Sequence, residues 1–316
     1  MSKQINFNDL QAAREEAILT DRSALGILRF SGETRLDLLH RMSTQDVVRL
    51  QPGEGAATIL TTDIGRTIDR LILYAGSQAV YALTGENNAD NIARYLMRFV
   101  FFNDDFHIED LSGDTAVFAI YGPKAQEKLQ TAGFPDTELP LHHWREQKID
   151  DIDIWLARTD PLNGDGYFVM CHEADRETVW QRLLDGGVTA VAEPTFEYIR
   201  IAAGLPRFGY EIAGDYIPLE TGLWADVSFN KGCYTGQEII ARMESRGKLA
   251  KQLARLRADG PLTAGDDIMA AGKKVGTITS AAEGPDGFVA LGYVKTAVLE
   301  AGSELFAGDT AVQVKT

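Results

Sequence analysis

The chain has 316 residues, of which 45% are hydrophobic and 24% are charged, and its formal net charge is −15. This length suits roughly two domains, or three small ones, with enough apolar material for a core that needs neither disulfides nor metals. Because an acidic surface repels phosphate backbones, we expect no stable binding to duplex nucleic acid.

Targeting, redox and metal signals are sparse. The stretch 1–23 contains no apolar run of signal-peptide length, and no window approaches the ~18 apolar residues of a membrane span. Cys171 and Cys233 are too few for a disulfide framework. We therefore expect a cytoplasmic protein with reduced thiols and no membrane contact. The histidines show no metal-ligand spacing, so no metal site is predicted.

Strand and helix patterns are mixed over the first two thirds of the chain. Alternating or continuous apolar runs predict strands, and apolar residues three or four apart predict helices. The predicted strands lie at 23–32, 58–62, 68–74, 78–85, 114–122, 152–159 and 166–171, and the predicted helices at 31–43, 86–102, 123–133, 174–187 and 194–206.

The last part of the chain, from residue 250, changes character. Short strand patterns at 251–259, 273–282, 287–294 and 310–315 are separated by Gly, Pro and Asp turns, which predicts a small β-barrel. The boundary is expected near Gly247–Ala250. The fold class is therefore α+β, with a large mixed portion followed by an all-β domain.

The segment "NKGCYTGQEIIAR", residues 230–242, contains Cys233. Thr235 is followed three residues later by Glu238, a capping-box pattern that predicts a helix starting at about Thr235. Backbone N–H groups at this helix start and the charge of Lys231 would favour the thiolate form of Cys233. The alternative is a buried structural thiol, and the local features leave both interpretations open. Cys171, inside the apolar run "YFVMC", is interpreted as structural.

The motif "KGCYTGQE" (residues 231–238) resembles the signature of the YgfZ family, within the superfamily of the glycine-cleavage T-protein, an aminomethyltransferase. The flanking stretches 199–223 and 275–294 are similar to T-protein-like segments in the same order. The resemblance implies a three-domain cloverleaf: two mixed α/β folate-binding domains and a C-terminal barrel. We expect them at 1–110 (with part of 195–247 returning to it), 111–194 and 248–316. It also implies that Cys233 is the working residue, with Lys231 beside it.

The same resemblance implies residues that bind tetrahydrofolate or a one-carbon-substituted form of it. Aminomethyltransferases carry a pair of acids in their first hairpin. Here Asp69 is kept and the second acid has become Arg70. The glutamate that would contact the pterin falls on Gly164, with Asp165 beside it, and a carboxylate there would suit the ring's neighbouring donors. These departures weaken aminomethyl transfer more than folate binding. A solvated strand residue paired with an arginine is the alternative for Asp69.

Three further residues match superfamily positions near the folate. Arg200 could hold a carbonyl or the carboxylate of the glutamate tail, and its alternative is a solvated helix residue. Tyr234 and Gln237 match the signature and are expected to line the central opening. Glu220 also matches, and is interpreted as a structural residue that bonds backbone N–H groups of a turn.

The resemblance favours a tetrahydrofolate-binding accessory protein for the assembly or maintenance of iron–sulfur enzymes, including tRNA-methylthiolating ones. Its partners would be folate and those enzymes or their assembly machinery. A folate-dependent aminomethyl- or methyltransferase is the alternative, so whether the protein is an enzyme stays open. A folate-sensing binding module is the third hypothesis.

Overall fold

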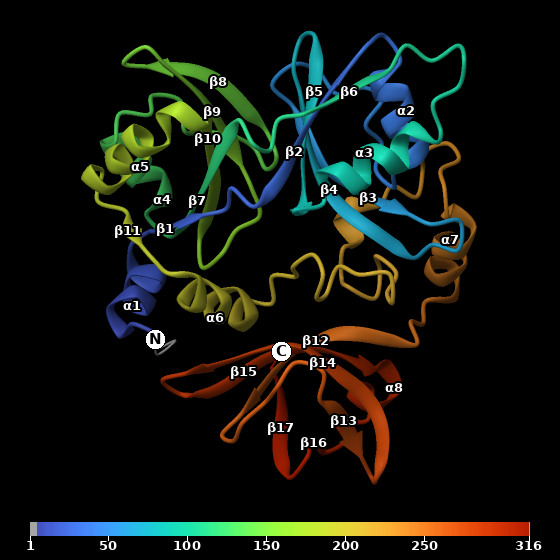
Figure 1. Cartoon of the computed structure of the whole chain (residues 1–316). Coiled ribbons are helices and arrows are strands. Elements are labelled where there is room, and N and C mark those ends of the chain that lie inside the picture. Colours follow the sequence, from blue (N-terminus) through green and yellow to red (C-terminus); the bar gives the residue numbers. More distant parts are fainter. Residues whose placement is uncertain (1–4, 316) are drawn as a thin grey trace.

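The structure, a computed structural model, describes residues 5–315 and contains three β-sheets arranged around a central segment (Figure 1). Two mixed units lie side by side, and the third sheet closes into a barrel below them. The expected fold class, two mixed α/β parts and a C-terminal β-barrel, is confirmed.

The first sheet has five strands in the order β3-β4-β5-β2-β6. Leucines on one face of this sheet and on two helices form a shared core, because each element presents an apolar side to the other. The strands are β2 (Leu25–Ser31), β3 (Gly55–Thr61), β4 (Thr67–Ala75), β5 (Ala79–Glu86) and β6 (His107–Asp110), and the helices are α2 (Arg35–Met42) and α3 (Ala89–Met97).

The second sheet has six strands in the order β11-β1-β7-β10-β9-β8, and its outer face is covered by helices α4 and α5. The strands are β1 (Ile18–Asp21), β7 (Thr115–Gly122), β8 (Trp144–Ile149), β9 (Ile152–Arg158), β10 (Asp165–His172) and β11 (Thr189–Ala190). The helices are α4 (Ala125–Thr131) and α5 (Arg176–Asp185), the latter preceded by η1 (Glu173–Asp175).

The N-terminal segment corrects one expected boundary. Strand β1 pairs with β7 and with β11, so it belongs to the second sheet, although the sequence analysis placed residues 1–110 in the first domain. Helix α1 (Phe7–Glu15) contacts β7, β11 and α6 of the same side. The chain therefore enters the second unit, crosses to the first, and returns.

The inner faces of the two sheets pack against each other. Ile72 and Tyr74 of β4 meet Val117 and Tyr121 of β7 in one buried cluster, and the Trp144 indole donates to the carbonyl of Ala75 across the joint. The alternation of strand side chains places Arg70 on the same inward side as Ile72 and Tyr74. The joint between the sheets therefore contains a charged side chain from the centre of β4.

The closed barrel has six strands in the order β12-β15-β14-β13-β16-β17. Its interior is filled by aliphatic side chains from every strand. The strands are β12 (Lys251–Ala258), β13 (Asp267–Ala270), β14 (Lys273–Gly284), β15 (Gly287–Lys295), β16 (Leu305–Ala307) and β17 (Thr310–Lys315), with α8 (Thr296–Glu300) between β15 and β16.

Helix α6 (Glu193–Ala203) and the segment that follows it run between the two sheets and the barrel (Figure 1). The segment contains η2 (Trp224–Asp226) and leads into α7 (Gln237–Arg246). Its apolar residues pack with Ile59 of β3, so this part of the chain returns to the first sheet. Within residues 5–315, no helix is long and apolar enough to cross a membrane.

Candidate functional site

A pocket of about 120 Å³ opens where the two sheets, the end of α6 and the loop after it meet. One wall is apolar and aromatic, with Tyr121, Phe168, Phe196 and Phe208. The polar part comes from β4, from the end of β5, from the loop after β9, and from the arginines Arg22, Arg200 and Arg207. Such a mixture, an apolar slot with a few fixed polar groups, is typical of a small-molecule site.

Asp69 lines this pocket from β4 and has no exposed surface. Its carboxylate accepts hydrogen bonds from the backbone N–H groups of Arg70 and Gly85, both at 2.8 Å, and from the Asn88 amide at 2.9 Å. Burial raises the pKa of Asp69 to about 6 in spite of these donors. The alternative of a solvated residue paired with an arginine is wrong, because Asp69 is buried and bonds amides instead.

Arg70, the residue that replaces the second acid, bridges two carboxylates. Its Nη1 lies 2.6 Å from Oδ2 of Asp160, and its Nε lies 2.6 Å from Oδ2 of Asp226. Burial would lower the pKa of Arg70, but the two carboxylates raise it above its ordinary value. Burial favours the neutral form of Asp160 too and would raise its pKa. The neighbouring Arg70 nevertheless holds the pKa of Asp160 below its usual range. Arg70 and Asp160 are therefore both charged at neutral pH.

Asp160, not Asp165, is the carboxylate that the loop between β9 and β10 places in the pocket. Asp165 begins β10 and forms an ion pair with Arg158 at 2.5 Å, outside the residues that line the pocket. Gly164, with φ of +139°, packs against the Gly122–Pro123 backbone, so a side chain there would collide. The sequence predicts Asp165 only because this residue is next to Gly164, the position that matches the glutamate of aminomethyltransferases.

Arg200 belongs to a network of polar contacts between the pocket and the barrel. Its guanidinium donates five hydrogen bonds: to Glu197 at 2.6 and 2.7 Å, to Glu211 at 3.1 Å, to the Leu205 carbonyl at 3.2 Å and to Ser280 at 2.9 Å. The side chain is 1% exposed, so the alternative of a solvated helix residue is wrong. With all its donors used, Arg200 has none left for an additional ligand.

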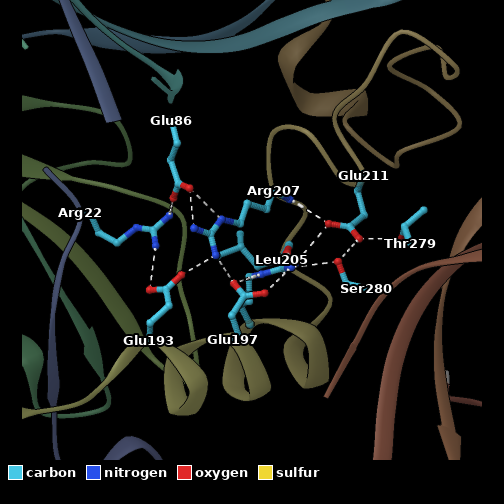
Figure 2. A network of polar contacts seen from close by, with 10 residues as sticks. Arg22, Glu86, Glu193, Glu197, Leu205, Arg207, Glu211, Thr279 and Ser280 are labelled. Atoms are coloured by element: carbon cyan, nitrogen blue, oxygen red, sulfur yellow. Dashed lines mark hydrogen bonds and ion pairs between the residues drawn. The ribbon is translucent and has the colours of Figure 1, made fainter. Parts of the chain in front are cut away.

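The network continues at the pocket rim. Arg207 pairs with Glu86, Glu193 and Glu197, and Arg22 pairs with Glu86 (Figure 2). Glu86 is the last residue of β5, whereas the other two acids lie on α6. These pairs therefore join the first sheet to α6, and they form the charged edge of the pocket.

Cys233 is exposed, whereas Cys171 is buried in the core of the second sheet. Two buried anchors flank the thiol. Lys231 precedes it, and Tyr234 follows it with its ring inside an apolar cluster. Only Gly232 and Cys233 project between them. Of the two interpretations left open for Cys233, the buried thiol is wrong, and the structural interpretation of Cys171 is confirmed.

Lys231 is directed into the protein. Its ammonium donates to the carbonyl of Ser43 at 2.8 Å, to that of Gln45 at 2.7 Å, and to that of His40. These carbonyls lie at and just beyond the end of α2, where backbone acceptors lack partners within the helix. Burial lowers the pKa of Lys231 to about 8. In this arrangement Lys231 fixes the segment, and its three N–H groups are used by carbonyls.

The other two motif residues are also turned to the protein. Tyr234 lies over the first sheet, and burial raises its pKa to about 12. Gln237 begins α7, and its side-chain oxygen accepts from the backbone N–H of Tyr234 at 3.3 Å. Neither lines the pocket between the sheets. Glu220 bonds the backbone N–H of Ile217, which confirms its interpretation as a turn residue.

Residues 2–231 match the family model of the GCVT N-terminal domain, and residues 251–315 match that of the glycine cleavage T-protein C-terminal barrel domain. The chain belongs to the glycine cleavage T-protein, or aminomethyltransferase, superfamily.

Several proteins are similar to this chain in sequence. One is a chloroplastic protein of Arabidopsis thaliana that is named as a proposed transferase. It is 29% identical over 95% of this chain and 70% of its own length. The aminomethyltransferase of Bacillus subtilis is 28% identical over 87% of this chain and 78% of its own. The crystal structure of the glycine cleavage system aminomethyltransferase T from Bartonella henselae has the same fold, with a TM-score of 0.87 over 98% of this chain and 88% of that one, at 24% identity.

The site of this T-protein-like chain thus has two separate parts. Asp69, Arg70 and Asp160 lie together at the pocket, whereas Cys233, Lys231 and Tyr234 lie on the returning segment. Sequence reasoning missed Asp160 and Asp226. The basic residue Arg70 in place of an acid was the available signal, because a buried arginine at the centre of a strand requires carboxylate partners.

Proposed function

We propose that the protein binds a reduced folate, tetrahydrofolate or a one-carbon-substituted form, in the pocket between its first two sheets. We further propose that it serves iron–sulfur enzymes as an accessory protein, including tRNA-methylthiolating ones. Membership of the aminomethyltransferase superfamily supports the first part. The resemblance of residues 231–238 to the YgfZ signature supports the second.

The exposure of Cys233 between two buried anchors is the observation that carries the accessory role. A free cysteine is usually buried, as Cys171 is. Here the chain holds the residues on both sides and leaves the sulfur at the surface. A thiol presented in this way suits contact with a partner or with sulfur chemistry more than a structural role.

The pocket residues suit a pterin ring. Asp160 offers two carboxylate oxygens to the neighbouring 2-amino and N3–H donors of such a ring, and the aromatic wall offers stacking surface. A volume of about 120 Å³ accommodates a ring system rather than a whole folate, so the tail would extend past the rim. Arg200 stays a candidate folate residue from the superfamily match, although its five bonds within the protein favour a structural role.

The second candidate is a folate-dependent aminomethyl- or methyltransferase. The pKa of about 6 at Asp69 favours it, because a buried carboxyl that titrates near neutrality suits general acid–base chemistry. Relatives named aminomethyltransferases point the same way. Against it stands Arg70, which places a guanidinium and its two carboxylates where an acid would be. A folate-sensing module, the third hypothesis, would need neither Cys233 nor Asp69 for chemistry.

A complementation experiment tests these functions. Cys233→Ala and Asp69→Asn, with Cys171→Ala as the matched loss of a sulfur, are each introduced into cells that lack the protein. The activity of a tRNA-methylthiolating enzyme is then measured. We expect Cys233→Ala alone among the cysteine variants to fail, while calorimetry shows its affinity for tetrahydrofolate changed by less than ~1 kcal/mol.

Each other outcome favours a different function. Full rescue by Cys233→Ala with failure of Asp69→Asn would establish the transferase in place of the accessory role. Rescue by both would leave a binding module. The absence of heat and of thermal stabilisation at ligand concentrations far above physiological would refute folate binding, since a ligand at 100 times its Kd adds about 2.7 kcal/mol.

A further inference from the structure

The Arg70 side chain connects the pocket to the segment that carries the exposed thiol. Arg70 and Asp160 line the pocket, and both oxygens of Asp160 are held by the guanidinium at 2.6 and 3.2 Å. The opposite edge of the guanidinium holds Asp226 at 2.6 Å. None of the residues 224–236, which include Asp226, lines the pocket. The guanidinium is therefore shared between a ligand-facing carboxylate and one outside the pocket.

Asp226 is in turn fixed to the Cys233 segment. The Thr44 hydroxyl donates to the carbonyl of Asp226 at 2.6 Å, and the carbonyl of Thr44 accepts from the N–H of Ser228 at 3.0 Å. The adjoining carbonyls of Ser43 and Gln45 hold Lys231. Any displacement of Asp226 thus reaches Lys231, the anchor two residues before Cys233, through the three consecutive residues Ser43, Thr44 and Gln45.

Two buried polar groups lie close to the Asp160 end of this bridge, outside the residues that line the pocket. Among the described residues, His142 Nδ1 and the Tyr74 hydroxyl are buried without a hydrogen-bond partner. The other ring nitrogen of His142 lies 3.9 Å from Asp160. Buried polar atoms without partners are expensive, so the surroundings of Asp160 contain hydrogen-bonding capacity that the protein itself does not use. Donors from a ligand would compete with Arg70 for the oxygens of Asp160.

We propose that Arg70 is a positioning residue that couples the occupancy of the pocket to the order of the Cys233 segment. When Asp160 is neutralised or bonded to a ligand, the guanidinium transfers its interaction to Asp226, and the segment from 226 to 234 becomes more rigid. The coupling itself depends only on the contacts of this chain. Its control by a reduced folate rests on the proposed function.

The coupling is tested first without ligand. Amide hydrogen exchange of residues 226–234 is followed in Asp160→Asn, with Asp165→Asn as the matched control outside the pocket. We expect exchange to slow at least about 5-fold in Asp160→Asn, as for a coupling of ordinary allosteric size, and to stay unchanged in Asp165→Asn. In an Asp226→Asn background the effect of Asp160→Asn should fall below about 2-fold. Unchanged exchange in the folded Asp160→Asn variant would overturn the proposal.

The second arm adds 5-formyltetrahydrofolate, a stable reduced folate, to the wild-type protein. We expect the same slowing in residues 226–234, and its loss in Asp226→Asn at unchanged affinity. Calorimetry separates the two ideas. Binding without a change in exchange would overturn the ligand-controlled coupling alone, whereas the absence of binding would refute the proposed function while the first arm still decides the coupling.

Discussion

The two cysteines differ in surroundings more than in sequence context. Cys171 lies on β10 with no exposed surface, and burial raises its pKa to about 12. Cys233 is exposed on an irregular segment whose neighbours are fixed. The apolar run around Cys171 made its burial predictable from the sequence. The exposure of Cys233 depends on where Lys231 and Tyr234 are anchored, and those contacts come from residues about 190 positions away.

We predict that Cys233 is alkylated far faster than Cys171 in the folded protein. Cys171 can react only after its part of the core opens, and its thiol resists ionisation, so its rate should be at least about 100-fold lower at pH 7. The single-cysteine variants Cys171→Ser and Cys233→Ser give the two rates separately. In denaturant, the control, the two variants should be alkylated at equal rates. Similar alkylation rates of the two variants in the native state would contradict the assignment of Cys233 as the accessible thiol.

A second prediction concerns pH and Asp69. Its pKa rises from 3.8 unfolded to about 6 folded, so the folded state binds the proton more tightly. The contribution of this group to stability is therefore full below about pH 3.8 and is lost as the pH rises through 6. Relative to wild type, Asp69→Asn should gain up to about 3 kcal/mol in unfolding free energy between these pH values. Urea unfolding at pH 4, 5, 6 and 7 measures this difference. A difference that is constant with pH would show that Asp69 titrates normally.

At the scale of elements, the residues next to Cys233 mainly fix this segment of the chain against the first sheet. Helix α7 begins at Gln237, two residues later than the capping-box pattern indicated, and Gly236 precedes it with φ of +83°. A Cβ on Gly236 would lie 2.5 Å from the carbonyl of Thr62, so only glycine allows the turn between β3 and β4 to approach. The sequence pattern located the helix but could not show this close contact. The Thr235 hydroxyl faces Met42 instead of capping the helix.

We predict that Lys231→Met destabilises the protein through the end of α2. The substitution keeps the length of the side chain but removes the donors of three carbonyls that are mostly shielded from water. The unfolding free energy should fall by about 1–3 kcal/mol, measured by urea denaturation. Lys274→Met, which removes an exposed lysine paired with Asp267, should change it by less than about 0.5 kcal/mol. Equal effects of the two substitutions would mean that the three carbonyl bonds are not formed in solution.

At the scale of the whole molecule, the barrel is attached through buried charges. Glu211, with no exposed surface, accepts from Arg200, Ser280 and Thr279, the last two on β14. The barrel itself could be predicted from short strands and turn residues. Its attachment could not, because the partners of Arg200 lie on three separate segments. The pairing of β1 with β11, about 170 residues apart, was unpredictable for the same reason.

We predict that Arg200→Met loosens this attachment. Removing the guanidinium leaves Glu211 and Glu197 without their charge partner, which should lower the unfolding free energy by about 3–5 kcal/mol. Limited proteolysis should then cleave near Gly247, ahead of the barrel, earlier than in wild type. Arg145→Met, at an exposed pair with Asp136, serves as the control. If Arg200→Met is cleaved at the wild-type rate but binds folate more weakly, Arg200 would instead be a residue that binds the ligand.

The edges of the sheets also bear on whether copies of the chain can pair strand to strand. The barrel is closed and has no free strand edge. At the open sheets, β6 presents mostly charged, exposed residues, β8 exposes Arg145, Glu146 and Lys148, and β11 has two residues. The outer edge of β3 is covered where the N–H of Thr44 bonds the carbonyl of Ile59. Exposed backbone of an edge strand is the usual template for aggregation. Each edge within residues 5–315 is short, charged or covered, so none offers a long bare strand to another copy, and a net charge of −15 adds repulsion between copies.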